Sequence, residues 1–243
     1  DGNQAPPLAP RAVCADLREL LPDVTEDSLL PGLFDVLTQD GALYVLPLTV
    51  RVDTLIMPSN LIDSPGVTLE KMPEDWVPVD SWNTPGNLFG LTAAFCIGRF
   101  VDRETGTCRF ETQEFIDILD WCKNWGGDGS TPEAPEKTLM KLGWISSLSW
   151  LASREDIAKE WFDGAGYTYA GYPVGEGGSA YLVLTSLGVS TSCQNLAGAK
   201  AFLAYCFSGK QESGLPANME VLREELAQYK AGNRTDWYGE VEN

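Results

Sequence analysis

The segment from Asp40 to Asp53, DGALYVLPLTVRVD, constrains the fold of this chain more than any other part of the sequence. Asp40-Gly41 is a hairpin turn signal, and the apolar run from Leu43 to Leu46 that follows it has the composition of a β-strand. Pro47 interrupts this run before β-branched residues resume. Because proline cannot donate a hydrogen bond to a sheet ladder, we expect Pro47 at a sheet edge, a bulge or a crossover between two sheets.

The composition is that of a globular protein. A chain of 243 residues suits one large domain or two small lobes, and 44% apolar with 21% charged residues is ordinary for such a protein. Thirty-five acidic against 17 basic residues give a net charge of −18, which argues against nucleic acid as a partner. The same charge is compatible with an extracellular protein, and no apolar run reaches the roughly 18 residues that a membrane span needs.

Histidine is absent from the sequence. This absence removes the Ser-His-Asp and Cys-His mechanisms and argues against a conventional zinc site, so no catalytic residue, metal or cofactor is predicted. No two cysteines form a CxxC pair, and we expect most of them to be buried free thiols. Cys96 and Cys108 flank a turn signal at residues 104–106, and the sequence leaves open whether these two form a disulfide.

Helical and strand-like patterns alternate along the chain. Capping residues and apolar periodicity predict helices over 16–21, 29–37, 112–123, 195–207 and 219–230, and a strand over 181–190. Two of these helices carry stripes that we expect to be buried, namely Phe115, Ile118, Leu119 and Cys122 in one, and Ala199, Phe202, Leu203 and Cys206 in the other. Residues 59–87 contain four prolines and predict a loop-rich excursion with a turn at Pro85-Gly86.

An ordered series of motifs resembles the extracellular solute-binding proteins of ABC importers, the family of the sugar- and oligosaccharide-binding proteins. The series consists of Asp-Gly-x-x-Tyr-x-x-Pro from Asp40, Met140 to Trp144, Gly171-Tyr172-Pro173 with Gly177, the strand Tyr181 to Val189, Ser192 with Ala199, Phe202 and Tyr205, and Gly214 to Asn218. Phe100 to Lys123 further resembles a subgroup common in gut Gram-positive bacteria, often lipoproteins linked to sugar import.

The resemblance implies an α/β fold with the type II, periplasmic-binding-protein-like two-lobe architecture. One lobe would combine residues 1–50 with 187–243, and the other would comprise 51–186. Family members carry a further strand-helix-strand unit before the hinge and further helices at the end. We therefore expect this chain to be incomplete at both ends, with the signal for export upstream.

The function that the resemblance implies is capture of an extracellular sugar or oligosaccharide and delivery to an ABC permease, without catalysis. The full-length protein would be a membrane-anchored lipoprotein at the cell surface. Sugar sites combine aromatic faces with planar polar groups, and five residues are predicted to contact the ligand on this basis. They are Trp144 after the strand glycine, Trp150 six residues later, Arg51 and Asp53 after the hinge proline, and Tyr172 before the return strand.

Two alternatives remain open at this point. A glycoside hydrolase needs only two carboxylates beside a sugar site, and 35 acidic residues do not rule out such a pair, although no pattern marks one. The second alternative is a structural or interaction module of a cell-surface protein, which keeps the fold but binds no ligand. Hydrolysis of a chromogenic glycoside distinguishes the first alternative from binding, and a structure with no open aromatic cleft would favour the second.

Overall fold

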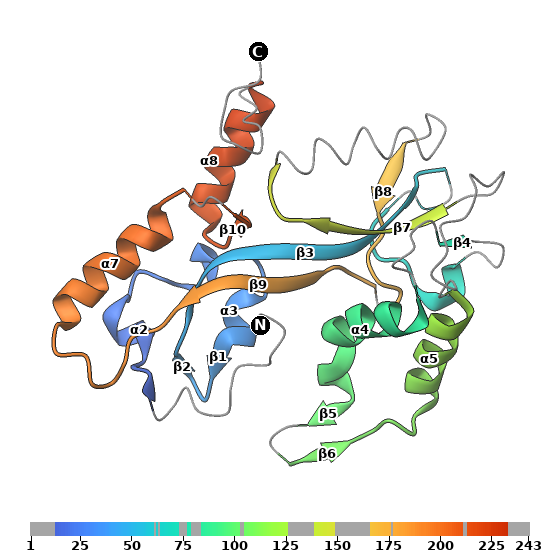
Figure 1. Cartoon of the computed structure of the whole chain (residues 1–243), viewed down its shortest axis with the longest axis horizontal. Helices are drawn as coiled ribbons and strands as arrows, with labels where there is room; N and C mark the ends of the chain where they lie inside the picture. The colour runs from blue at the N-terminus through green and yellow to red at the C-terminus, as the bar shows by residue number, and fades with distance from the viewer. Residues whose placement is uncertain are drawn as a thin grey trace. The chain divides into compact units, whose positions relative to one another are not determined.

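Short helices and strands alternate along the chain (Figure 1). A computed structural model describes residues 13–60, 62, 64–72, 77–78, 84–102, 105–125, 139–148, 166–175, 177–210 and 213–232. The elements are, in order, α2 (Leu17–Leu20), η1 (Glu26–Ser28), α3 (Leu33–Leu37), β1 (Thr38–Gln39), β2 (Ala42–Leu43), β3 (Leu46–Pro58), η2 (Leu69–Lys71), β4 (Val77–Pro78), α4 (Pro85–Cys96), η3 (Ile97–Arg99), β5 (Val101–Asp102), β6 (Thr107–Cys108), α5 (Gln113–Trp125), β7 (Leu139–Ile145), β8 (Tyr167–Tyr169), β9 (Ala180–Leu187), α7 (Leu196–Ser208), β10 (Leu215–Pro216) and α8 (Met219–Lys230).

The chain folds into two compact units, each with its own buried core. Unit 1 comprises Asp1–Arg51, Ile145–Ala152 and Tyr181–Asn243, and unit 2 comprises Val52–Trp144 and Ser153–Ala180. The lobe bounds expected from the sequence, 1–50 with 187–243 and 51–186, stay a prediction. Among the described helices, none is long and apolar enough to cross a lipid bilayer.

The hairpin before β3 has the conformation that its sequence predicts. Asp40 and Gly41 both have positive φ, 49° and 79°, as the tight two-residue turn between antiparallel β1 and β2 requires. The Asp16 carboxylate caps α2 by accepting from Arg18 N at 3.0 Å and also accepts from Leu43 N at 3.0 Å. One carboxylate therefore fixes both the start of α2 and the strand β2 of the hairpin.

Strand β3 is the longest strand, with 13 residues, and its sequence range passes from unit 1 into unit 2. β10 pairs with it antiparallel at Thr49 and Val50, and β8 pairs with it antiparallel from Ile56 to Pro58. β7 and β9 also pair with β3, and β4 pairs with β7 in parallel. Pro47 is the second residue of β3, beside the point where the chain passes from the two-stranded sheet β1–β2 to the sheet that contains β3, which fits the expected crossover between two sheets. The strand begins beside the proline, a position where the missing N–H is tolerated.

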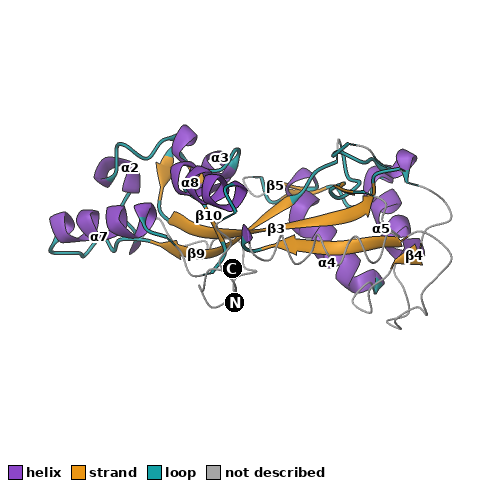
Figure 2. Cartoon of the chain, turned by 90° about the horizontal axis from the view of Figure 1, so that it is seen from above, coloured by secondary structure: helices purple, strands orange, loops and turns teal. Residues whose placement is uncertain are grey.

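The core of unit 1 packs short helices and α7 around β2, β3 and the end of β9. It consists of Leu17, Leu21, Leu43, Leu46, Leu48, Val189 and Leu203. Figure 2 shows α3 and α8 on the same side of β3. The predicted caps of α7 and α8 are confirmed, because Asn195 Oδ1 accepts from Gly198 N at 2.9 Å and Asn218 Oδ1 accepts from Glu220 N at 2.9 Å.

The apolar stripe expected on α7 is only partly buried. Leu203 is buried, and Ala199 and Cys206 pack against the unit 1 core. Phe202 is 59% exposed, so its assignment to the core was wrong. Residue 202 lies at the edge of the stripe, and a helical period does not indicate how far burial extends to each side of it.

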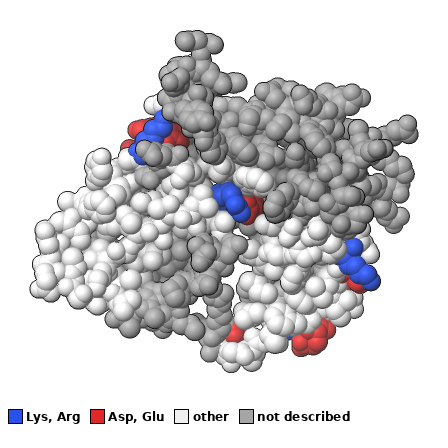
Figure 3. All heavy atoms as spheres, in the orientation of Figure 1, with Lys and Arg blue, Asp and Glu red and all other residues white. Residues whose placement is uncertain are grey.

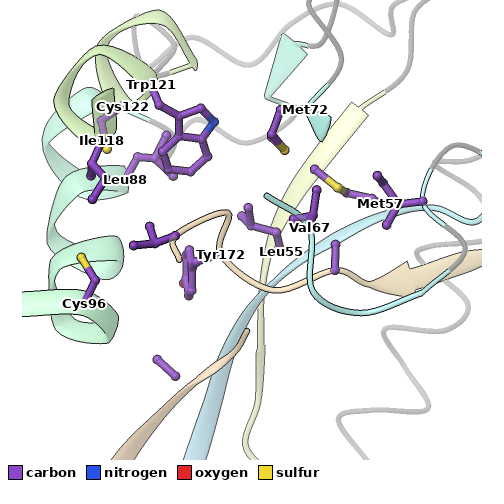
Figure 4. Close-up of a cluster of buried hydrophobic side chains, with 14 of the residues drawn as sticks. Leu55, Met57, Val67, Met72, Leu88, Cys96, Ile118, Trp121, Cys122 and Tyr172 are labelled. Carbon is purple, nitrogen blue, oxygen red and sulfur yellow. The ribbon is translucent and has the colours of Figure 1, made fainter. Parts of the chain in front are cut away.

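The core of unit 2 is formed where α4 and α5 pack together over Leu55, Val67 and Tyr172 (Figure 4). In α5, Phe115, Ile118 and Cys122 are buried as expected from the stripe. Leu119 is 41% exposed and Trp121 is 5% exposed, so the prediction that Leu119 is buried was wrong. The side chain of Trp121 takes the buried position on the neighbouring side of the helix.

Helix α4 starts where the sequence predicted a turn, at the end of the expected loop-rich segment 59–87. It begins at Pro85, and Thr84 Oγ1 caps it by accepting from Asn87 N at 3.3 Å. Proline is favoured at the first helical position, because its missing N–H has no partner within the helix there. The Pro85-Gly86 pair, which resembles a turn, is therefore the start of a 12-residue helix.

Candidate ligand-binding residues

Arg51 and Asp53 lie two residues apart on β3, so strand geometry directs their side chains to the same face. Asp53 is 8% exposed and Arg51 is half-buried. Each of them already interacts with another group of the protein. A buried carboxylate that has a partner is held in a fixed orientation, which suits either a structural ion pair or a preorganised contact to a ligand hydroxyl.

Trp144 lies near the end of β7 and is 37% exposed. An exposed tryptophan can stack its indole ring on the apolar face of a pyranose ring. Trp150, the second tryptophan predicted to contact ligand, lies outside the described residues.

Tyr172 is fully buried in the core of unit 2, at 0% exposed. Its ring contacts Phe95, with ring centroids 6.1 Å apart, and its backbone exchanges hydrogen bonds with Gly178 at 2.6 and 3.2 Å. Gly171 has a φ of 80°, and a Cβ there would lie 2.6 Å from the Gly178 backbone. The turn is therefore tightly packed, and the burial of Tyr172 favours a packing role; its contact to ligand stays a prediction.

A pair of hydroxyl groups beside these residues was not predicted. Ser179 Oγ donates to Thr54 Oγ1 at 2.9 Å, and Thr54 is completely buried next to Asp53 in the sequence. The bond ties the start of β9 to β3 within unit 2. Alternation on β3 places Thr54 on the face opposite Asp53. Its partner Ser179 lies 125 residues away in the sequence, so no local pattern predicts this hydrogen bond.

The two buried cysteine thiols are not suited to act as nucleophiles. All six cysteines are free, but only Cys96 and Cys122 are buried, so the expectation that most are buried was wrong. Cys108 is exposed on β6, and it forms no disulfide with Cys96. Burial raises the pKa of the Cys96 thiol and raises the pKa of the Cys122 thiol to about 12. Both thiols are therefore protonated at neutral pH and poor nucleophiles.

Other chemistry is sparse in the part of the chain that the structure describes. No group of three or more Cys, Asp or Glu side chains there is arranged to hold a metal ion. Burial raises the pKa of the Glu225 carboxyl on α8, and the Lys210 ammonium partly opposes this rise. A raised carboxyl pKa is one property of a general acid, but a glycosidase needs a second carboxylate beside it.

Comparison with known proteins gives matches only at the level of structure. No family model matches the sequence, and no curated protein matches it. An ABC transporter solute-binding protein from Thermotoga lettingae, bound with α-D-tagatose, superimposes with a TM-score of 0.53 at 17% identity, over 98% of this chain and 70% of that one. An ABC substrate-binding protein from Listeria monocytogenes in complex with cycloalternan superimposes with a TM-score of 0.49 at 17% identity, over 90% of this chain and 65% of that one.

The first of these matches establishes the class of fold. The chain has the α/β fold of the solute-binding proteins of ABC transporters, which confirms the predicted type II, two-lobe fold class. It corresponds to 70% of the length of the tagatose-bound protein. At 17% identity the likeness is one of fold, and function has to be argued from the residues.

Proposed function

We propose that this chain captures a sugar or oligosaccharide outside the cell for uptake by an ABC importer and performs no catalysis. The observation that carries the proposal is the fold shared with a solute-binding protein that holds a sugar, α-D-tagatose. The exposed indole of Trp144 adds support, because an aromatic face is what the apolar side of a sugar ring requires.

In this proposal Trp144 stacks on the sugar, and Arg51 and Asp53 hydrogen-bond its hydroxyls, with Trp150 as a further aromatic contact. The two compact units support two lobes, for which we propose the bounds 1–50 with 187–243 and 51–186. Ligand would favour the closed arrangement of the lobes as a population shift, because only that arrangement makes contacts from both of them.

The partners proposed are a small-molecule ligand and an ABC permease in the membrane, with no nucleic acid. The net charge of −18 supports the exclusion of nucleic acid. The proposed location is extracellular, with the full-length protein anchored at the cell surface as a lipoprotein.

A thermal-shift screen against mono- and oligosaccharides, with amino acids and peptides as controls, tests the proposal. A ligand at about 100 times its dissociation constant adds about 2.7 kcal/mol to stability, which raises Tm by several degrees for a chain of this size. We expect a shift with one class of sugar, reduced in Trp144→Ala and kept in Tyr205→Ala, a control that removes an exposed aromatic ring from α7.

Three results would contradict the proposal. A shift with amino acids or peptides alone would assign another ligand class. The absence of any shift would leave the fold in place and favour the non-binding interaction module. Release of a chromophore from an aryl glycoside would show catalysis and favour the glycoside hydrolase.

A further inference from the structure

A cavity of about 290 Å³ lies in unit 2, between η3 and the first turn of α5. Its lining consists of Arg99, Phe100, Arg109, Thr112 and Glu114, and none of the five predicted ligand-binding residues is among them. Small-molecule sites start at roughly 300 Å³ and combine an apolar wall with a few convergent polar groups. The size and the lining of this cavity both fit that description for a compact ligand.

Hydrogen bonds to backbone carbonyls hold the polar groups of the cavity in place. Arg109 N donates to Phe100 O at 2.8 Å, and Arg109 Nη2 donates to Arg99 O at 2.5 Å. Thr112 Oγ1 donates to Arg109 O at 2.9 Å, so its oxygen is left to accept a hydrogen bond. The cavity is thus preorganised by the chain that links α4 to α5.

The charges of the lining do not cancel. Arg99 Nη2 pairs with Glu114 Oε1 at 2.6 Å, whereas Arg109 makes no ion pair with any carboxylate in the described part of the chain. Two guanidinium groups against one carboxylate leave one positive charge, and Thr112 directly precedes the positive end of the 13-residue helix α5. Among the residues that line the cavity, positive side-chain charges therefore outnumber negative ones.

We propose that this cavity binds a sugar acid of about one pyranose ring, with its carboxylate on Arg109. The guanidinium fork matches a carboxylate with two parallel hydrogen bonds. Thr112 Oγ1 and the second oxygen of Glu114 accept from the ligand's hydroxyl groups, and Phe100, which is 2% exposed and packs on Phe115, lies on the buried side of the cavity. This second site does not depend on the proposed function, because it uses none of its residues.

Calorimetric titration with D-glucuronate, D-glucose and acetate tests this site. We expect saturable binding of D-glucuronate, weakened about tenfold or more in Arg109→Gln, because a charge-assisted bidentate contact is lost. Arg223→Gln removes an exposed charge on α8 and should leave the affinity unchanged. Trp144→Ala should also leave it unchanged, which separates this site from the proposed sugar-uptake site.

Several results would overturn the proposal. Equal weakening by Arg109→Gln and Arg223→Gln would show that only overall charge matters. Acetate binding as tightly as D-glucuronate would show that the sugar ring is not recognised, and D-glucose binding as tightly would show that the carboxylate is not. If Arg109→Gln does not fold, Arg109→Lys keeps the charge but loses the fork, and unchanged affinity in that variant would contradict the assignment.

Discussion

Thr49 and Thr92 are buried threonines whose hydroxyl groups are satisfied to different degrees. Thr92 Oγ1 donates to Leu88 O at 2.7 Å within α4. Thr49 Oγ1 has no hydrogen-bond partner in the described part of the chain, and the residue is 1% exposed on β3 beneath Gly214. A buried hydroxyl without a partner has lost its hydrogen bonds to water, and no hydrogen bond within the protein compensates for that loss.

Thr49→Val should therefore stabilise the protein by about 1 kcal/mol, because a methyl group of similar size replaces the unpaired hydroxyl. Thr92→Val is the matched control and should destabilise it by about 1 kcal/mol, because it removes a hydrogen bond that is made. Urea unfolding midpoints of the two variants check this pair. A lower midpoint for Thr49→Val would show that its hydroxyl is satisfied after all.

The buried thiol of Cys122 is expected to make the free energy of unfolding decrease at alkaline pH. Its pKa is raised from 9.0 to about 12 by burial, so the unfolded chain loses this proton at lower pH than the folded chain does. The resulting stability is fully present below pH 9.0 and is lost as the pH rises towards about 12. Urea unfolding at pH 7 and pH 10 should show a smaller loss for Cys122→Ala than for the natural chain; equal losses would contradict the assignment.

At the scale of elements, the signals that the sequence carries best are local ones. Asn195 and Asn218 cap α7 and α8 as predicted, since a capping side chain and its backbone partner lie within three residues. The same kind of signal was misread at Pro85, where proline and glycine suggest a turn but Thr84 starts a helix. Burial was harder to predict: Leu119 and Phe202 fit the helical period but are exposed, and on α5 the buried face is shifted towards Trp121.

Gly90 gives a test of helix α4 as an element. It is exposed in the interior of the helix, and an added Cβ would meet no atom within 4 Å. Gly90→Ala should stabilise the protein by about 0.5–1 kcal/mol, because alanine loses less backbone entropy in a helix. Gly171→Ala is the contrasting control and should destabilise it, since φ is 80° and the new Cβ meets the Gly178 backbone. Thermal unfolding measures both, and a destabilised Gly90→Ala would argue against helix at this position.

At the scale of the molecule, the order of motifs along the chain predicted the α/β fold class correctly, because strands, turns and helix caps leave local marks. The candidate site was less accessible. Trp144 and Arg51 are placed by strand positions, but the Ser179–Thr54 bond and the burial of Tyr172 depend on residues far apart in the sequence. On the face that Figure 3 shows, the described Lys and Arg side chains form small separate areas near Asp or Glu side chains, a distribution that composition alone does not reveal.

Isothermal titration of the chain with the sugar that scores in the thermal-shift screen is the most direct test of the central claim. The proposed function predicts saturable heat with one ligand per chain, and about fivefold or more weaker binding in Trp144→Ala, because stacking on an indole contributes on the order of 1 kcal/mol or more. The absence of saturable heat with every mono- and oligosaccharide tried would contradict the claim that this chain captures a sugar.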